Sequence, residues 1–343
     1  MITNKVCWQS PSNLAIVKYW GKYGMQIPMN PSISFTLDRS YTETTIELLT
    51  QGKGNIEFTY DGSKNEKFAN KVKRFLNALE LYFINDFDLK IDSKNTFPHS
   101  AGIASSASAM SAIALCITEL QFNLEGRDIR SDEFLKMASY RSRLGSGSAC
   151  RSLFSTASLW GRIPNVPQSS DEYGIDWSAN VHNNFKDIQD WIFIINKEEK
   201  SVSSTAGHEL MKLHPYRDAR IQQANDNIHK LIKILSEGDW NGFIDICEEE
   251  ALTLHGLMMS SRPGYLLLEP DSIRIIQAIR KFRNETNINI GFSIDAGPNI
   301  HMLFPQKFMS EVASWCKTSF GDYYNHGKII FDQIGKGPKQ IIL

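Results

Sequence analysis

The chain lacks a strong charge of either sign. Its 37 Lys and Arg residues nearly balance its 38 Asp and Glu residues, which leaves a formal net charge of -1 at pH 7. A protein that holds nucleic acid by neutralising many phosphates needs a clear excess of cationic side chains. The balance therefore argues against a nucleic-acid partner, and any anion that the protein binds should be small and locally held.

Cysteine is scarce and scattered. The five residues, Cys7, Cys116, Cys150, Cys247 and Cys316, include no CxxC pair, and their number is odd. A disulfide framework or a structural zinc site needs paired or regularly spaced cysteines. We therefore expect free thiols in a reducing compartment and a cytoplasmic protein.

Membrane and metal signals are also sparse. The first 13 residues show no basic segment followed by an apolar core, so they do not look like a signal peptide. No apolar run approaches the ~20 residues that a membrane span needs, so we expect no membrane partner. The eight histidines form no HExxH or similar spacing, and the pattern predicts no metal held by protein side chains alone.

The bulk composition is that of a globular protein with more than one core. A chain of 343 residues exceeds the size of most single cores, so we expect two domains. Hydrophobic residues make up 42% and charged residues 22%, as in ordinary folded proteins. Residues 163–185 carry prolines, serines and asparagines without periodicity, and a strand begins near residue 191. The predicted domains are residues 1–187 and 188–343.

Helical and strand patterns alternate without strict βαβ order, which predicts an α+β fold. Strands separated by turns are expected within residues 31–60, followed by a short strand at 87–91. A nearly all-apolar stretch after residue 109 predicts a buried helix, and Ser131 is a good N-cap for the next helix. The remaining predicted helices span residues 66–83, 131–143, 218–236, 240–259 and 270–283, and the remaining strands span 288–294, 300–304 and 328–332.

One segment is suited to a phosphate. Residues 97–112, FPHSAGIASSASAMSA, crowd small side chains ahead of the buried helix. A helix start leaves backbone N–H groups unpaired and carries a partial positive charge, so low bulk there lets a phosphate approach. The P-loop lysine is missing, and a tight packing surface between helices is the alternative interpretation. The candidate phosphate-binding residues are Gly102, Ala104, Ser105, Ser106 and Ser108.

A second glycine-serine turn lies at residues 143–152, RLGSGSACRS. Ser146, Gly147 and Ser148 make a donor-rich turn, and Arg151 follows Ser148 by three residues. The planar guanidinium of arginine suits a carboxylate or a phosphate. One such turn is usually an ordinary loop, but two in one chain favour a ligand with two anionic groups.

Two further segments place charged groups beside strand ends. Lys18 and Lys22 bracket Tyr19 and Trp20 near the end of a strand, although lysines that protect a strand edge would look the same. Asp295 follows an apolar strand and enters a sharp Gly-Pro turn, which holds its carboxylate on a rigid support. An aspartate that caps its own turn is the alternative.

Together, these segments resemble the diphosphomevalonate decarboxylase family of the GHMP kinase superfamily. The likeness is collinear from about residue 10 to residue 304. Ala104, within GIASSAS, is similar to the decarboxylases rather than to the GLGSSA loop of mevalonate kinase and its closer relatives. The matching motifs are NLAIVKYWGK (13–22), AGIASSAS (101–108), GSGSACRS (145–152), VSSTAG (202–207) and DAGPN (295–299).

The resemblance implies a fold and an activity. The fold is the two-domain GHMP kinase fold, with an N-terminal domain like domain 2 of ribosomal protein S5, a ferredoxin-like C-terminal domain and the site in the cleft. The activity is ATP- and Mg²⁺-dependent: the C3 hydroxyl of 5-diphosphomevalonate is phosphorylated, then phosphate and carbon dioxide leave to give isopentenyl diphosphate. Magnesium would arrive with ATP and keep several waters. Family members are commonly homodimers.

Matched motif by motif, the resemblance also implies residue roles. Asp295 would take or orient the proton of the C3 hydroxyl with Lys18 beside it, and Arg151 would hold the C1 carboxylate. The diphosphate contacts fall on Tyr19, Lys22, Ser146, Gly147 and Ser148. The ATP contacts fall on Gly102, Ala104, Ser105, Ser106 and Ser108, with Ser204 near the transferred phosphate.

The chain departs from the family pattern in two places. Residues 23–32, YGMQIPMNPS, are shorter and less acidic than the family's charged hairpin, and Thr205 stands where some bacterial members have an arginine. A phosphomevalonate decarboxylase or a mevalonate 3-kinase-type enzyme is therefore the alternative. Relatives that only phosphorylate the 3-hydroxyl lack the aspartate and lysine pair, so Asp295 and Lys18 favour decarboxylation. A non-catalytic sensor would not need this pair together with Arg151.

Overall fold

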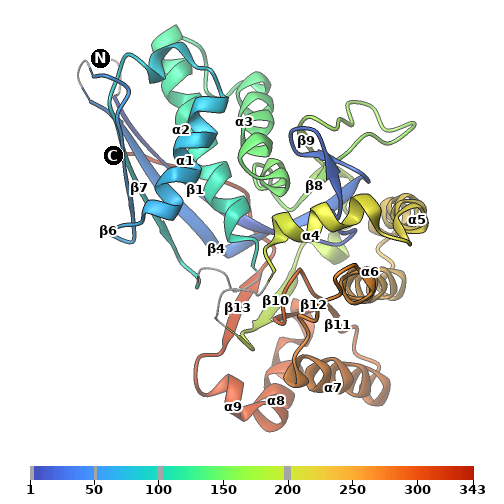
Figure 1. The fold of residues 1–343 in the computed structure, drawn as a ribbon. Coiled ribbons are helices and arrows are strands. Elements are labelled where there is room, and N and C mark those ends of the chain that lie inside the picture. Colours follow the sequence, from blue (N-terminus) through green and yellow to red (C-terminus); the bar gives the residue numbers. More distant parts are fainter. Residues whose placement is uncertain (1–3, 50–51, 99–102, 197–201) are drawn as a thin grey trace.

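Two β-sheets form the framework of the protein, one built mainly by each half of the chain (Figure 1). The computed structural model describes residues 4–49, 52–98, 103–196 and 202–343. The larger sheet is eight-stranded, and its main path runs β14-β1-β4-β7-β5-β6, with β8 paired to β4 and β9 paired to β8. Its strands are β1 (Lys5–Ala15), β4 (Ser32–Leu48), β5 (Ile56–Tyr60), β6 (Ser63–Lys64), β7 (Leu89–Asn95), β8 (Ala157–Trp160), β9 (Gly174–Asp176) and β14 (Lys339–Ile341).

Three helices cover one face of the larger sheet: α1 (Glu66–Ala78), α2 (Ser105–Glu125) and α3 (Asp132–Gly145). The central helix α2 packs on β1 and β4 and against α3. It is apolar nearly all round and almost entirely buried, as its sequence predicts. Ser131 caps α3 by accepting the backbone N–H of Phe134, again as predicted.

The smaller sheet is antiparallel, in the order β11-β12-β10-β13. Its strands are β10 (Ile188–Phe193), β11 (Gly291–Ser293), β12 (Ile300–Pro305) and β13 (Ile329–Gln333). Helices α7 (Pro270–Thr286) and α8 (Met309–Ser319) pack against it, followed by the short α9 (Gly321–Tyr324). Helix α7 begins where sequence rules place it, with Pro270 at its first turn and a capping box formed by Glu269 and Ser272.

Helices α5 (Arg217–Glu237) and α6 (Trp240–Ser260) connect the two units. Their apolar residues share one buried cluster with residues of β1, β4 and β8 from the larger sheet and with Leu303 from the smaller sheet. A short helix, α4 (Ser204–Leu210), and a two-strand hairpin, β2 (Lys22–Tyr23) and β3 (Ile27–Pro28), complete the elements around the cleft. The core is thus continuous between the halves, which fixes the groups that face each other across the cleft.

Asp332 joins the two sheets directly. This carboxylate lies on β13, is 1% exposed, and accepts backbone N–H groups of β4. Its Oδ1 lies 3.0 Å from Asp38 N and 2.8 Å from Arg39 N, and its Oδ2 lies 2.8 Å from Ser40 N. These bonds satisfy backbone donors that would otherwise be left unpaired in the middle of a long strand.

The structure corrects several predicted boundaries. The turn expected near Asp38 is absent because β4 runs unbroken from Ser32 to Leu48, with Asp332 supplying acceptors where the ladder is irregular. Helix α1 ends at Ala78 rather than at residue 83, since Glu80 has a left-handed backbone (φ 49°). The strand expected at 87–91 spans Leu89–Asn95. Patterning missed the helices α4, α8 and α9 and the strands β2, β3, β6, β8, β9 and β14. The domain boundary at 187/188 stays a prediction, and β14 pairs with β1 across it.

The expectation that no segment is long and apolar enough for a membrane span needs one amendment. Within the described ranges, α2 alone meets the length and composition of a spanning helix. Of its most apolar 18 residues, 78% are buried inside the protein. The apolar surface of α2 is therefore used to build the core around the larger sheet.

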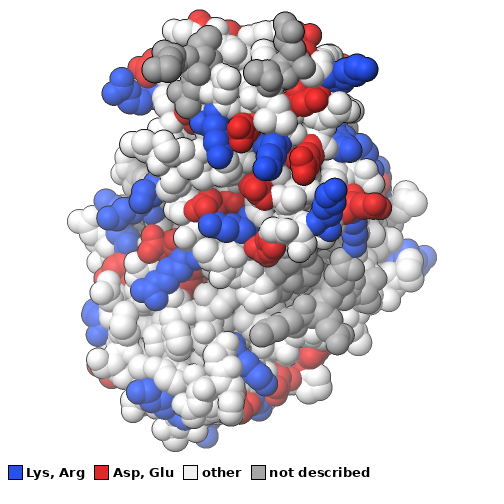
Figure 2. All heavy atoms as spheres, turned by 90° about the vertical axis from the view of Figure 1, so that its left-hand side faces the viewer, with Lys and Arg blue, Asp and Glu red and all other residues white. Residues whose placement is uncertain are grey.

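Charges of both signs mix on the outer side of the larger sheet. Figure 2 views the molecule from the side of β6 and β7 and shows basic and acidic side chains interspersed, with no broad area of one sign on this face. Several are paired, such as Lys94 with Glu43 at 2.8 Å and Lys5 with Glu47 at 3.8 Å. Such exposed pairs contribute little to stability, but they leave this face close to neutral.

Candidate active site

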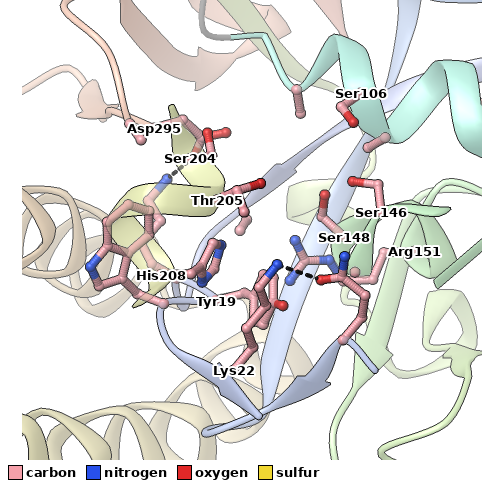
Figure 3. Close-up of a pocket in the computed structure, with 18 of the residues that line it drawn as sticks. Tyr19, Lys22, Ser106, Ser146, Ser148, Arg151, Ser204, Thr205, His208 and Asp295 are labelled. Carbon is pink, nitrogen blue, oxygen red and sulfur yellow. Dashed lines mark hydrogen bonds and ion pairs between the residues drawn. The ribbon is translucent and has the colours of Figure 1, made fainter. Parts of the chain in front are cut away.

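Most of the predicted site residues line a single cleft between the two units (Figure 3). The cavity holds about 230 Å³. Figure 3 shows Asp295, Ser204 and His208 on one side and Ser146, Ser148 and Arg151 on the opposite side. The predicted residues that line it are Lys18, Tyr19, Lys22, Ala104, Ser106, Ser146, Gly147, Ser148, Arg151, Ser204 and Asp295.

Lys18 and Asp295 form an ion pair on one wall of the cleft. Lys18 is 2% exposed, and its Nζ donates to Asp295 Oδ1 at 2.7 Å and to Ser293 Oγ at 2.8 Å. The turn that carries Asp295 is held by the Gly297 N–H, which donates to the Asp295 carbonyl at 2.7 Å. A carboxylate oriented in this way is a suitable proton acceptor for a substrate hydroxyl.

The backbone of Lys18 is fixed by a second buried ion pair. Glu250 on α6 accepts the Lys18 N–H at 2.8 Å and pairs with Arg220 of α5 at 2.6 Å. Arg220 in turn donates to the Lys18 carbonyl at 3.0 Å. Both charged side chains are at most 1% exposed, so each depends on the other for its counter-charge. The network holds the segment after β1, which carries Lys18, against α5 and α6.

Arg151 supplies a buried cation on the opposite wall. It ends the 3₁₀ turn η2 (Gly147–Arg151) and is 2% exposed. One guanidinium nitrogen donates to Ser32 Oγ, Nε has no partner, and within the described chain no carboxylate forms an ion pair with it. Burial lowers the pKa of Arg151, although the group stays cationic at neutral pH. A buried cation without a protein counter-ion is suited to an anionic ligand.

The turn before Arg151 is tight because it lies against Tyr19. A Cβ on Gly147 would lie 2.7 Å from Tyr19 Oη and 3.0 Å from the Trp160 ring, so only glycine fits. Tyr19 Oη is buried next to this turn and has no hydrogen-bond partner among the described atoms. Burial raises the pKa of Tyr19, which keeps its hydroxyl a neutral donor. The turn thus combines close approach with a donor that awaits an acceptor.

The start of α2 has the features expected of a phosphate site. Ala104 precedes the helix in the left-handed region (φ 44°), a strained conformation for alanine, and makes no side-chain cap. The first N–H groups of the helix therefore have no side-chain acceptor. Lys71 of α1 reaches this point, and its Nζ donates to Ser106 Oγ at 2.7 Å. These small residues, uncapped N–H groups and a nearby cation fit the phosphates of ATP and its magnesium.

Two family models match the chain in succession. The "Diphosphomevalonate decarboxylase-like N-terminal domain" matches residues 10–170, and the "Mevalonate 5-diphosphate decarboxylase C-terminal domain" matches residues 191–341. The described residues that line the cleft all fall within these two matched ranges. The chain belongs to the diphosphomevalonate decarboxylase family.

Curated and solved relatives of the family agree. The diphosphomevalonate decarboxylase of Ganoderma lucidum is 27% identical over 336 residues, covering 88% of this chain and 79% of the relative. The mevalonate diphosphate decarboxylase of Enterococcus faecalis has a solved structure with a TM-score of 0.83, 28% identity and 99% coverage of both chains. A further structure, of MDDEF with MVAPP, AMPPCP and magnesium, has a TM-score of 0.83, 29% identity and 99% coverage of both chains. These likenesses confirm the two-domain α+β GHMP kinase fold.

Two predicted ATP contacts, Ser105 and Ser108, are not among the described residues that line the cleft. Ser108 is fully buried, and its hydroxyl meets Thr42 Oγ1 at 2.7 Å and the Ser105 carbonyl at 3.2 Å. Ser105 lies in the first turn of α2 outside the set of lining residues, and Gly102 lies outside the described residues. The ATP-binding roles of Gly102, Ser105 and Ser108 stay predictions from the family resemblance, as do the roles of the other predicted contacts.

Sequence reasoning missed several residues of this family member's cleft. The most informative are Asn13, Gln26, Lys71 and His208. Asn13 holds the Arg151 turn by donating to the Ser148 carbonyl at 3.2 Å, and Gln26 accepts Lys22 Nζ at 2.9 Å. Asn13 is the first residue of the NLAIVKYWGK motif, so the motif could have identified it as a site residue. Gln26 lies in the β2–β3 hairpin and Lys71 on a helix face, neither within a distinctive motif, and His208 directly follows the VSSTAG motif.

Proposed function

We propose that this protein catalyses the ATP-dependent decarboxylation of 5-diphosphomevalonate to isopentenyl diphosphate. The observation that carries the proposal is the placement of the Lys18–Asp295 pair and the unpaired Arg151 in one cleft. A base at one wall and a carboxylate clamp at the other suit a substrate with a hydroxyl at C3 and a carboxylate at C1. The alternatives, a 5-phosphomevalonate decarboxylase and a 3-kinase, differ at the 5-position or lack the second step.

Asp295 acts in the first step. Its carboxylate orients the C3 hydroxyl and accepts its proton as the oxygen attacks the γ-phosphorus of ATP, so that a new O–P bond forms and the bond to ADP breaks. Lys18 holds the carboxylate through its 2.7 Å contact and places an ammonium beside the transferred phosphoryl group. The magnesium that accompanies ATP would neutralise charge on the phosphates.

Arg151 acts in the second step. The C3–O bond breaks with its electron pair leaving on phosphate, and the C1–C2 bond electrons form the C2–C3 double bond as carbon dioxide departs. The guanidinium of Arg151 holds the C1 carboxylate so that the breaking C1–C2 bond stays aligned with the departing phosphate. Its burial against the Trp160 ring, 5.8 Å from guanidinium carbon to ring centroid, fixes this direction.

The 5-diphosphate is assigned to the remaining polar residues of the cleft. Tyr19 and Lys22 lie at the end of the cleft away from Ser106, and the Ser146–Ser148 turn lines the wall between them and Ser106. Burial lowers the pKa of Lys22, and its Nζ donates to Gln26 Oε1 at 2.9 Å. We assign the 5-diphosphate to these groups and the phosphates of ATP to the start of α2, one phosphate site for each substrate.

We also propose a cytoplasmic homodimer. The five cysteines are all free and buried, as suits a reducing compartment. Leu213, Tyr216 and Met259, in the segments from α4 to α6, expose large apolar side chains that would suit a subunit contact. Light scattering of the purified protein measures the mass directly, and a monomer at working concentration would remove the dimer from the proposal.

A substrate panel tests the activity. Purified protein with ATP and Mg²⁺ is given mevalonate, 5-phosphomevalonate or 5-diphosphomevalonate, and ADP and carbon dioxide are both assayed. We expect the largest kcat/KM with the 5-diphosphate and carbon dioxide with every ADP. ADP without carbon dioxide would identify a 3-kinase, and a preference for the monophosphate would identify the alternative decarboxylase.

A further inference from the structure

His208 occupies an unusual position in the cleft. It lies on α4, is 8% exposed, and lines the cavity beside Tyr19 and Lys22 (Figure 3). Its ring is held between two aromatic rings, with centroid distances of 4.4 Å to Tyr19 and 4.7 Å to Trp20. The proposed mechanism has no role for this residue.

The hydrogen bond at one ring nitrogen fixes the tautomer. His208 Nδ1 accepts the backbone N–H of Gly21 at 2.9 Å. A nitrogen that accepts carries no proton, so in the neutral ring the proton is on Nε2. No partner within the described chain meets Nε2, so the Nε2–H of His208 is available as a donor to a ligand in the cleft.

The ring stays neutral at physiological pH. Burial, followed by repulsion from Lys22 and Arg151, lowers the pKa of His208 to about 3. The nearby cations therefore do not face a third positive charge. His208 can donate one hydrogen bond to an anion without adding to the repulsion between Lys22 and Arg151.

The position of α4 depends on Gly207. A Cβ there would lie 2.6 Å from the Trp20 ring and 2.7 Å from Tyr265 Oη, so the helix approaches Trp20 only with glycine before His208. Thr205, one turn earlier, lines the same cavity with a short uncharged side chain. The close approach of α4 to Trp20 thus places His208 in the cleft. Helix α4 (Ser204–Leu210) contains no lysine or arginine.

We propose that His208 Nε2–H binds the 5-diphosphate of the substrate and helps the site to select it over shorter anions. The inference rests on the proposed function, because it assigns the anion that meets Nε2. The 5-diphosphate rather than ATP is the partner, since His208 packs on the Tyr19 ring and lies beside Lys22, apart from Ser106. The bond is made before and during the reaction, so it should lower KM and leave kcat unchanged.

His208→Asn is the main test. Asparagine can still offer an oxygen to Gly21 N–H, but it does not reach the position of Nε2. We expect KM for 5-diphosphomevalonate to rise about 10-fold or more, as for loss of a hydrogen bond to a charged group, while kcat and KM for ATP stay within twofold. His208→Gln, whose amide reaches farther, should recover part of the lost affinity.

His214→Asn is a matched control. His214 is also buried, its Nδ1 also accepts a backbone N–H, from Tyr216 at 3.1 Å, and it does not line the cavity. This variant should leave KM for both substrates unchanged. An equal rise of KM in both variants would mean that the effect comes from loss of packing, and it would overturn the role assigned to His208.

The tautomer is tested on the unaltered protein. Nitrogen NMR of the histidine rings should show His208 neutral with its proton on Nε2 at pH 7, and a proton on Nδ1 or an imidazolium would overturn the inference even if the variants fail to fold. If the wild-type protein releases no carbon dioxide from any mevalonate form, the proposed function fails. If it does and His208→Asn has normal KM, only the inference about His208 fails.

Discussion

Lys18 Nζ lies 2.7 Å from Asp295 Oδ1, although 276 residues separate the two along the chain. The contact joins the segment that follows β1 of the larger sheet to the turn after β11 of the smaller one. It therefore places the reactive carboxylate where the two units meet, and it makes the geometry of the site depend on how they are held together.

Replacing the base should stop the reaction without emptying the site. Asp295→Asn keeps the size of the side chain but removes the proton acceptor, so turnover should fall at least 1,000-fold, on the order of a lost catalytic base. ATP binding, measured by calorimetry, should stay within threefold because the proposed ATP site is at the start of α2. Near-normal activity in this variant would remove Asp295 from its role.

Arg151→Lys tests the carboxylate clamp. Lysine keeps the positive charge but loses the planar fork and its two parallel donors. Steady-state kinetics should show kcat/KM for the mevalonate substrate lowered about 100-fold, with KM for ATP little changed. The exposed Arg130→Lys is the control and should be neutral, because its side chain is 88% exposed. Equal effects in both variants would argue against the clamp.

Gly147→Ala tests the close approach at Tyr19. The added methyl group would meet Tyr19 Oη at 2.7 Å and would displace that ring from the cleft. We expect KM for the 5-diphosphate substrate to rise about 10-fold with the loss of one donor. Gly256→Ala is the control variant, since nothing lies within 4 Å of its added Cβ. Gly126→Ala would not serve as a control, because that glycine has a left-handed backbone. Unchanged KM in Gly147→Ala would contradict the assignment of Tyr19.

Asp332 should matter for stability rather than for chemistry. Asp332→Ala leaves the N–H groups of Asp38, Arg39 and Ser40 without their acceptor, so the free energy of unfolding should fall by about 3 kcal/mol. Urea unfolding measures the change. Asp322→Ala, which removes a half-exposed carboxylate near Arg274, should cost less than about 1 kcal/mol. A loss of similar size in both variants would rule out the role of Asp332 as the link between sheets.

The neutral His208 also predicts a pH effect on stability. Its pKa is lowered to about 3 in the folded protein, whereas an unfolded histidine titrates near 6.5, so below that pH the unfolded chain binds more protons. Stability should therefore be lost as pH falls from about 6.5 toward 3, by up to about 1.4 kcal/mol per pH unit from this group. The free energies of unfolding of wild type and His208→Asn, compared across this range, should converge as pH falls. Parallel curves would contradict the lowered pKa.

The sequence was informative where the chemistry is local. The small residues before α2, the turn that ends at Arg151 and the aspartate after β11 are each legible within ten residues, and all three reach the cleft. The capping residue Ser131 was likewise readable as a local hydrogen-bond pattern.

Long-range contacts were not legible. Glu250 and Arg220 sit in ordinary helical patterns, and only the fold shows that they hold the backbone of Lys18. Asp38 signals a turn by its residue type, but Asp332, 294 residues away, supplies the acceptor that keeps β4 extended. The tautomer of His208 depends on a backbone group 187 residues earlier. In each case a partner distant in sequence overrides or completes the local preference.

The most direct measurement of the central claim is the ratio of carbon dioxide to ADP with 5-diphosphomevalonate labelled at C1. The account predicts that wild-type protein with ATP and Mg²⁺ releases one labelled carbon dioxide for each ADP, because the cleft that phosphorylates C3 also holds the carboxylate through Arg151. ADP formed with no labelled carbon dioxide would contradict it.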